Sequence, residues 1–261
     1  PKEPNSISNN EISCLAIQGN TYLWIGTRGG GVNSLNLTNG IITRYNNDSF
    51  DGLVNDIAVD ATGDVWMGTS TGLLKLIQNK DTAYFVNISE KAIYRKETGE
   101  PFIPRYESNG VRVIYPTLKG DLLIGSDEGI FKYNYTNGEF ILFDSELYDV
   151  GKPTVITEDR NGTIWIGSYN GIIRVESELN NQHVVYKYNS KAPKPYSLKS
   201  NWIEDIAIDH EGKAWIAIHG YGLAQIENEE VKYVNDDLGM PFVKVLHELY
   251  MDQTGIMWVG S

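Results

Sequence analysis

Hydrophobic residues in this chain fall into short runs and alternations. The stretch VNDIAVD, Val54 to Asp60, alternates or runs apolar, which is typical of an inner strand buried on both sides. After the turn ATG, the runs DVWMGTS, LLKLI and TAYFVN predict a second, a third and a more polar outer strand. Helical periodicity is absent throughout, so we expect an all-β protein with almost no helix.

One turn-and-strand unit recurs along the chain, as DATGDVWMGTSTG from Asp60, DRNGTIWIGSYNG from Asp159, DHEGKAWIAIHGYG from Asp209 and DQTGIMWVGS from Asp252. The Asp can accept hydrogen bonds from the backbone ahead of it and the Gly can take a positive φ, which favours a short hairpin. The residue after the Trp-Ile pair falls at Gly26, Gly68, Gly125, Gly167, Ala217 and Gly260, with gaps of 42, 57, 42, 50 and 43 residues. A period near 42 residues is that of a four-stranded propeller blade.

A tryptophan occupies the same slot in most copies: Trp24, Trp66, Trp165, Trp215 and Trp258, with Leu123 in the remaining one. We interpret these residues as packing elements of the repeat, because no reaction needs the same catalytic residue in every copy.

The repeat predicts one β-propeller domain over residues 1–261, with about five full blades and a partial sixth. The expected blade cores are residues 10–45, 53–86, 109–143, 153–188, 201–234 and, in part, 242–261. An incomplete ring leaves sheet edges open. Three arrangements remain open: further sequence completes the ring, another chain completes it, or the module stays an open arc.

Charge and composition restrict the partners. The formal net charge is −12, which disfavours nucleic acid and anionic membrane surfaces. A single cysteine, Cys14, allows no intrachain disulfide, and no apolar run reaches the length of a membrane span. The chain starts without Met and stops inside a repeat, so we expect a piece of a longer protein.

The repeated Asp-x-x-Gly-x-x-Trp-Ile-Gly-Thr/Ser-x-x-Gly-Leu/Ile pattern resembles the two-component regulator propeller repeat. The segments PNSISNNEISCLAI and PYSLKSNWIEDIAI, which lead into inner strands, resemble it too. The resemblance implies the periplasmic sensor region of a hybrid two-component protein, ahead of a membrane helix, a histidine kinase and a response regulator. It also implies that this region recognises oligosaccharides. It implies, in addition, a propeller of seven blades, two more than the five complete blades that the repeat predicts here. None of the signalling parts is present in this sequence.

A ligand of such a propeller is expected on the face formed by two sets of loops, those leading into the inner strands and those between second and third strands. Aromatic rings and planar polar groups suit a sugar, because rings stack on C–H patches and polar groups bond in fixed directions. The side chains of this kind in the variable slots are Arg28, Arg112, Tyr169, Asn170, Trp202, His219 and Tyr221.

Three alternatives involve chemistry or protein partners. A sialidase needs clustered arginines, and only Arg112 stands out in the inner strands. A lyase resembling streptogramin lyase needs a histidine base and metal-binding acids, and His247 is the best base among the four histidines. A protein-interaction scaffold is the third.

We expect no enzymatic activity, no cofactor and no metal. The expected partners are a small molecule or oligosaccharide, the rest of the parent sensor and, as one arrangement, a second copy in a homodimer.

Overall fold

The computed structural model describes residues 3, 5–45, 52–78, 83–88, 93–94, 101–102, 110–143, 150–179, 182–234 and 246–261. Every regular element in these ranges is a β-strand, so the predicted all-β class is confirmed. Nothing in the described ranges forms a helix able to cross a bilayer. The described part of the chain lacks residues 79–82, 109, 180–181 and 242–245 of the predicted blade cores.

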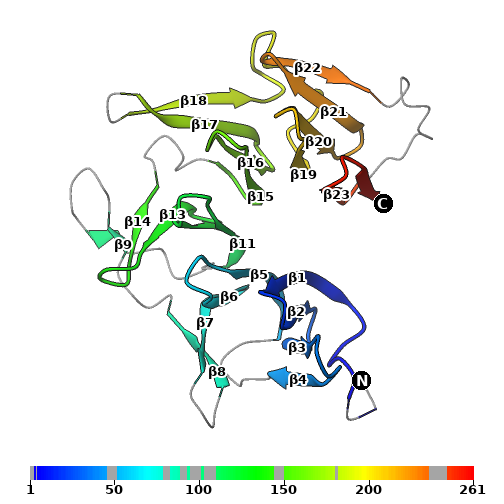
Figure 1. Cartoon of the computed structure of the whole chain (residues 1–261). Coiled ribbons are helices and arrows are strands. Elements are labelled where there is room, and N and C mark those ends of the chain that lie inside the picture. Colours follow the sequence, from blue (N-terminus) through cyan, green and yellow to red (C-terminus); the bar gives the residue numbers. More distant parts are fainter. Residues whose placement is uncertain are drawn as a thin grey trace. The chain divides into compact units, whose positions relative to one another are not determined.

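The strands form sheets in chain order, which Figure 1 colours from blue to red. The first sheet is β1 (Ile12–Gln18), β2 (Tyr22–Thr27), β3 (Val32–Asn36) and β4 (Ile42–Tyr45). The second is β5 (Val54–Val59), β6 (Val65–Thr69), β7 (Gly72–Gln78) and β8 (Ala83–Asn87). The third is β11 (Val111–Pro116), β12 (Leu122–Ser126), β13 (Gly129–Asn134) and β14 (Glu139–Leu142), extended at β14 by β9 (Ile93–Tyr94) and β10 (Pro101–Phe102).

The later sheets repeat this antiparallel order. The fourth is β15 (Pro153–Glu158), β16 (Ile164–Ser168), β17 (Gly171–Leu179) and β18 (Gln182–Tyr188). The fifth is β19 (Ile203–Ile208), β20 (Ala214–Ile218), β21 (Gly222–Glu227) and β22 (Glu230–Tyr233), and the last has only β23 (Glu248–Met251) and β24 (Met257–Gly260). Meanders of four antiparallel strands are the blades that the repeat predicts.

The chain divides into two compact units, residues 1–145 with the first three sheets and residues 146–261 with the others. Whether the whole chain acts as one domain stays a prediction. Within each unit, hydrophobic cores lie between successive sheets. Trp66 packs with residues of the third sheet, and Trp165 with residues of the fifth.

The repeated turn has the geometry expected from the sequence. The Oδ1 atom of Asp60 accepts hydrogen bonds from the amides of Thr62 and Asp64 at 2.9 and 3.0 Å, and Gly63 has a φ of 85°. Asp159, Asp209 and Asp252 make the same pair of amide bonds. The Asp residues thus fix the turn between the first and second strands.

Burial confirms the predicted inner strand in its middle and differs near its start. In β5, Ile57 lies in the core shared with the first sheet and Ala58, on the opposite face, lies in the core shared with the third, whereas Asn55 is exposed. The second strands β6, β12 and β16 are buried at every position. The first strand lies at the edge of its sheet, while the second has a bonded strand on each side and carries the packing.

A β-bulge interrupts the first strand of each four-stranded meander. The pairing register shifts between Ile12 and Cys14, and at the matching places in β5, β11, β15 and β19. One residue there has no partner across the ladder: Ser13, Asn55, Arg112, Thr154 or Glu204. A bulge redirects the side chain it carries. Asn55 and Thr154 use theirs to bond the next sheet, at the carbonyls of Val111 and Ile203, both at 2.8 Å.

Candidate functional site

Three aromatic side chains from the fourth and fifth sheets meet at the ends of their strands. Tyr169 lies in the turn between β16 and β17, Trp202 directly precedes β19, and His219 follows β20. The Trp202 and His219 ring centroids are 3.9 Å apart with an interplanar angle of 9°. Those of Tyr169 and Trp202 are 4.9 Å apart at 45°. We call these three residues the aromatic cluster, in which Trp202 is the middle ring.

Backbone hydrogen bonds hold the cluster in place. The amide of His219 donates to the carbonyl of Trp202 at 3.0 Å, and the amide of Tyr169 donates to the carbonyl of Lys152 at 3.1 Å. The two bonds occupy the same place in successive repeats. Sheets of the same construction therefore present their turns on the same side, and neighbouring turns come within ring-contact distance.

Glu204, the bulged residue of β19, orients the imidazole. Its Oε1 atom lies 2.6 Å from Nδ1 of His219. An ionised carboxylate only accepts hydrogen bonds, so Nδ1 carries the proton, and a neutral ring then presents Nε2 as an acceptor. The Glu204 side chain is 15% exposed, so the pair is partly shielded from water.

This arrangement suits a ligand with both apolar and hydroxylated surface. Tyr169 and Trp202 remain 41% and 38% exposed. Because the His219 ring covers one face of Trp202, a sugar ring would stack on an outer ring of the cluster or along the exposed Trp202 edge. Phenol, indole and imidazole supply directional polar groups at its border.

Two further predicted residues are in the same connections. Asn170 adjoins Tyr169, and its side chain packs over Gly151, where a Cβ atom would come within 2.7 Å of it. Tyr221 lies two residues beyond His219 and is 42% exposed. Both are thus close in sequence to the aromatic cluster.

The two predicted arginines belong to the N-terminal unit. Arg112 is the bulged residue of β11, and its Nε atom pairs with Asp127 in the turn after β12. Arg28 is exposed, and its backbone bonds the carbonyl of Glu11 and the side chain of Asn9. The Arg112–Asp127 pair occupies the slots that Glu204 and His219 occupy in the fifth sheet, with the basic and acidic residues exchanged.

The repeated tryptophans lie at the predicted slot with different exposures. Trp24, Trp66 and Trp165 are buried, Trp215 is partly buried, and Trp258 is 60% exposed. The indole nitrogens of Trp66, Trp215 and Trp258 donate to the Asp six residues earlier, and that of Trp24 donates to Gln18.

The histidine expected to be the best general base lies elsewhere. His247 is exposed and precedes β23, where its amide bonds the carbonyl of Gly260. His210 lies in a turn between Arg160 and the carbonyl of Asp252. No group of three or more His, Cys, Asp or Glu residues suited to a metal occurs in the described ranges.

The sequence prediction did not include Glu204, although the sequence contains a signal for it. In two repeats a basic and an acidic residue stand 15 positions apart: Arg112 with Asp127, and Glu204 with His219. The bulge that brings these residues together has no signature in the hydrophobic pattern.

Residues 151–170 match the family described as "Two component regulator propeller". None of the curated proteins matches the chain.

Three solved structures share the fold. The extracellular domain of the hybrid two-component system BT3049 from B. thetaiotaomicron has a TM-score of 0.72 and 19% identity, over 100% of this chain and 33% of that one. For the corresponding BT4673 domain the TM-score is 0.57 and the identity 20%, over 95% and 40%. Virginiamycin B lyase from Staphylococcus aureus has a TM-score of 0.64 and 16% identity, over 97% and 79%.

The chain thus spans only 33% and 40% of the two extracellular domains. At these identities the likeness concerns the fold, and the matched repeat concerns the family. Together with the four-stranded meanders, they identify the chain as a β-propeller protein in which residues 151–170 match the two-component regulator propeller repeat.

Proposed function

We propose that this chain is part of the extracytoplasmic sensor region of a hybrid two-component regulator and that it binds an oligosaccharide or a similar small ligand. The observation that carries the proposal is the aromatic cluster, in which Tyr169, Trp202 and His219 converge from two sheets and stay partly exposed. The matched repeat and the likeness to extracellular domains of hybrid two-component systems support the setting.

In this proposal the chain binds and transmits without catalysis. A ligand that touches turns of two neighbouring sheets binds best when those turns lie close together. It therefore shifts the equilibrium toward this packing, by as much as its affinity for this packing exceeds its affinity for one in which the turns lie further apart. A histidine kinase outside this chain would receive the change, directly or through a homodimer.

The test is a thermal-shift and calorimetric screen of the chain against plant and host oligosaccharides, followed by Trp202→Ala. A ligand that binds the native state raises its stability. Loss of the middle ring should weaken binding by about 1–3 kcal/mol. Trp258→Ala is the matched control, because Trp258 is an exposed tryptophan in the structural slot.

Equal affinity in the wild type and Trp202→Ala would remove this site. Absence of any shift across the panel would favour the protein-interaction scaffold.

A lyase is the second candidate, and one observation favours it. Glu204 holds His219 as a carboxylate would hold a general base, and virginiamycin B lyase shares the fold. Turnover of a streptogramin B substrate that disappears in His219→Ala and with a chelator would establish it. Substrate left intact by the wild type would rule it out.

A further inference from the structure

The aromatic cluster keeps polar atoms that no other described residue uses. The Nε1 atom of Trp202, the hydroxyl of Tyr169 and the Nε2 atom of His219 have no hydrogen-bond partner in the described part of the chain. Trp202 and Tyr169 are exposed, and Nε2 of His219 is not among the buried unpaired atoms of the described ranges. A ligand can therefore reach each of the three side chains.

Glu204 decides what the Nε2 atom of His219 offers to a ligand. The Glu204 carboxylate only accepts hydrogen bonds, and it lies 2.6 Å from Nδ1 of His219, so the proton of a neutral ring is on Nδ1. The stack on Trp202, at 3.9 Å and 9°, fixes the plane of the imidazole. Nε2 therefore presents a lone pair to the ligand in that plane, while a partly shielded carboxylate lies against the other nitrogen.

A lone pair at this place selects among sugar substituents. A hydroxyl group can donate to Nε2 of His219 and accept from the indole N–H of Trp202 or from another donor, whereas an ionised carboxylate can only accept. A carboxylate facing Nε2 would leave two acceptors opposed and unpaired, which costs binding free energy. It would also bring a second negative charge toward Glu204.

Lys152 brings a positive charge to the border of the aromatic cluster. Its carbonyl accepts from the amide of Tyr169, as the carbonyl of Trp202 accepts from the amide of His219, so Lys152 holds in the fourth sheet the slot of Trp202 in the fifth. Lys152 therefore adjoins Tyr169 rather than the pair of Glu204 and His219. The residue is exposed, so water and salt screen its charge.

From these contacts we propose that the aromatic cluster takes a neutral sugar unit, one hydroxyl of which donates to Nε2 of His219, and that Glu204 makes the cluster reject acidic sugars near neutral pH. This inference rests on the proposed function and names the ligand class of the same site. Glu204 is a positioning residue, because it acts by deciding which nitrogen of His219 carries the proton. Protonation of His219 turns Nε2 into a donor, so acidification admits acidic sugars.

The tautomer is measured on the ligand-free full chain labelled with ¹⁵N, at pH 8, where an ordinary histidine is neutral. Imidazole ¹⁵N shifts separate protonated from unprotonated nitrogens, and the His219 signals are identified by their loss in His219→Phe. We expect the proton on Nδ1. Glu204→Gln should move it partly to Nε2, because an amide can also donate to Nδ1. Glu248→Gln, in the exposed part of β23, is the matched control and should leave the tautomer unchanged.

The selectivity is measured with glucose and glucuronate, which share a ring and differ at C6, where glucuronate carries a carboxylate. Titrations follow the indole N–H signal of Trp202, identified by its loss in Trp202→Phe. At pH 8 glucuronate should bind about tenfold or more weakly than glucose, because acceptors would be opposed. At pH 5.5, or in Glu204→Gln at pH 8, the difference should shrink to about threefold or less. Lys152→Met should not reduce the preference for glucose.

A proton on Nε2 of His219 in the wild type would overturn the role of Glu204. Glucuronate bound as tightly as glucose at pH 8 would overturn the preference for a neutral unit, and a preference unchanged at pH 5.5 and in Glu204→Gln would show that His219 does not cause it. A Trp202 signal that neither sugar moves would count against the proposed function alone, because the tautomer is measured without a ligand.

Discussion

The indole nitrogens of the repeated tryptophans differ in their partners although the sequence slot is the same. Trp66 donates to Asp60, which also accepts a hydrogen bond from the hydroxyl of Tyr135 at 2.9 Å. Trp165 is equally buried, but its Nε1 atom lacks a partner among the described residues. The six-residue spacing between Asp and Trp therefore does not by itself decide whether the indole nitrogen bonds the carboxylate. The packing around each pair decides it.

This contrast predicts that the same substitution destabilises the protein to different extents at the two positions. Trp66→Phe should lower the free energy of unfolding by about 1–3 kcal/mol more than Trp165→Phe, because it breaks a hydrogen bond to a carboxylate and leaves Asp60 a donor short. Both changes remove similar volume, so each controls for the packing loss of the other. Urea denaturation measures both. Equal losses would mean that Trp165 is bonded like the others in solution.

At the scale of elements, successive sheets approach closely where the second strand carries glycine. A Cβ atom on Gly68 would lie 2.8 Å from Val111 of the third sheet, and one on Gly167 would lie 2.8 Å from Ile203 of the fifth sheet and 2.7 Å from Val155 of its own sheet. Glycine at these positions thus lets the first strand of the next sheet pack directly against the backbone. The fifth sheet accommodates Ala217 at the same slot, fully buried.

Gly167→Ala should therefore destabilise the C-terminal unit by about 1–3 kcal/mol, since the added methyl group overpacks a buried contact. Gly260→Ala is the control, because its nearest neighbour would lie at an ordinary 3.6 Å. Chemical denaturation gives both values. A neutral Gly167→Ala would show that the two sheets can separate without cost.

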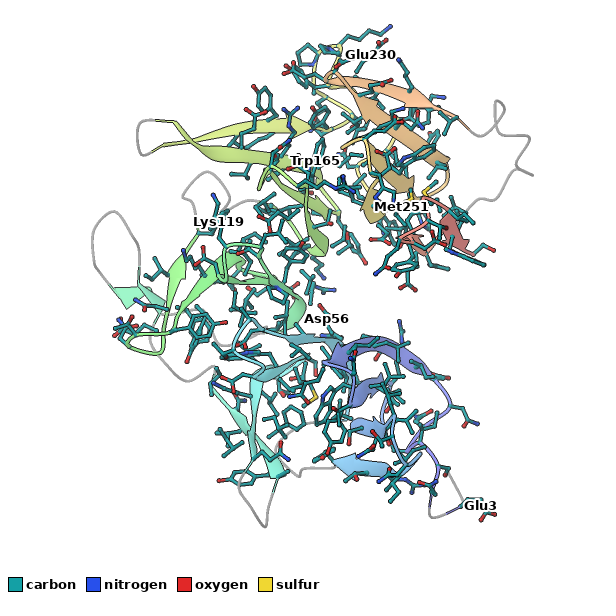
Figure 2. All side chains as sticks on the ribbon, viewed as in Figure 1. Glu3, Asp56, Lys119, Trp165, Glu230 and Met251 are labelled. Atoms are coloured by element: carbon teal, nitrogen blue, oxygen red, sulfur yellow. The ribbon has the colours of Figure 1, made fainter. Side chains whose placement is uncertain are left out.

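At the scale of the whole molecule, two buried carboxyl groups join sheets. Asp56, labelled in Figure 2, accepts from the amide of Ile114 at 2.7 Å, and Asp205 accepts from that of Leu249 at 2.6 Å. Desolvation by burial raises the pKa of each to about 7, although these amides and those of Ile57 and Ile206 lower it.

The sign of the resulting pH dependence follows from proton binding. Between about pH 4 and pH 7 the folded chain holds protons on Asp56 and Asp205 that the unfolded chain has released. Stability from these groups is therefore present at low pH and is lost as pH rises toward about 7.

We expect the free energy of unfolding to be larger at pH 5.5 than at pH 8, by about 1.4 kcal/mol per unit of pKa displacement at most. The double variant Asp56→Asn, Asp205→Asn should flatten this dependence. Asp252→Asn should not, because hydrogen bonds from Thr254 and Trp258 hold the pKa of Asp252 below its usual range. A dependence unchanged in the double variant would assign it to the overall charge of −12 instead.

The sequence by itself determined the strands, the Asp-x-x-Gly turns and the sequence of four-stranded sheets. Each of these follows from local alternation, turn chemistry and a repeat period, all of which are properties of neighbouring residues. It also named Tyr169, Trp202 and His219, since aromatic side chains in variable turns of a regular repeat stand out from the pattern.

Only the tertiary structure decided which of these residues meet. The bulge that turns Glu204 toward His219, the burial of Asp56 and the unpaired nitrogen of Trp165 depend on how one sheet packs against the next. Such contacts join residues far apart in the chain. Their geometry depends on small displacements of one sheet against the next, which the order of residue types along the chain does not encode.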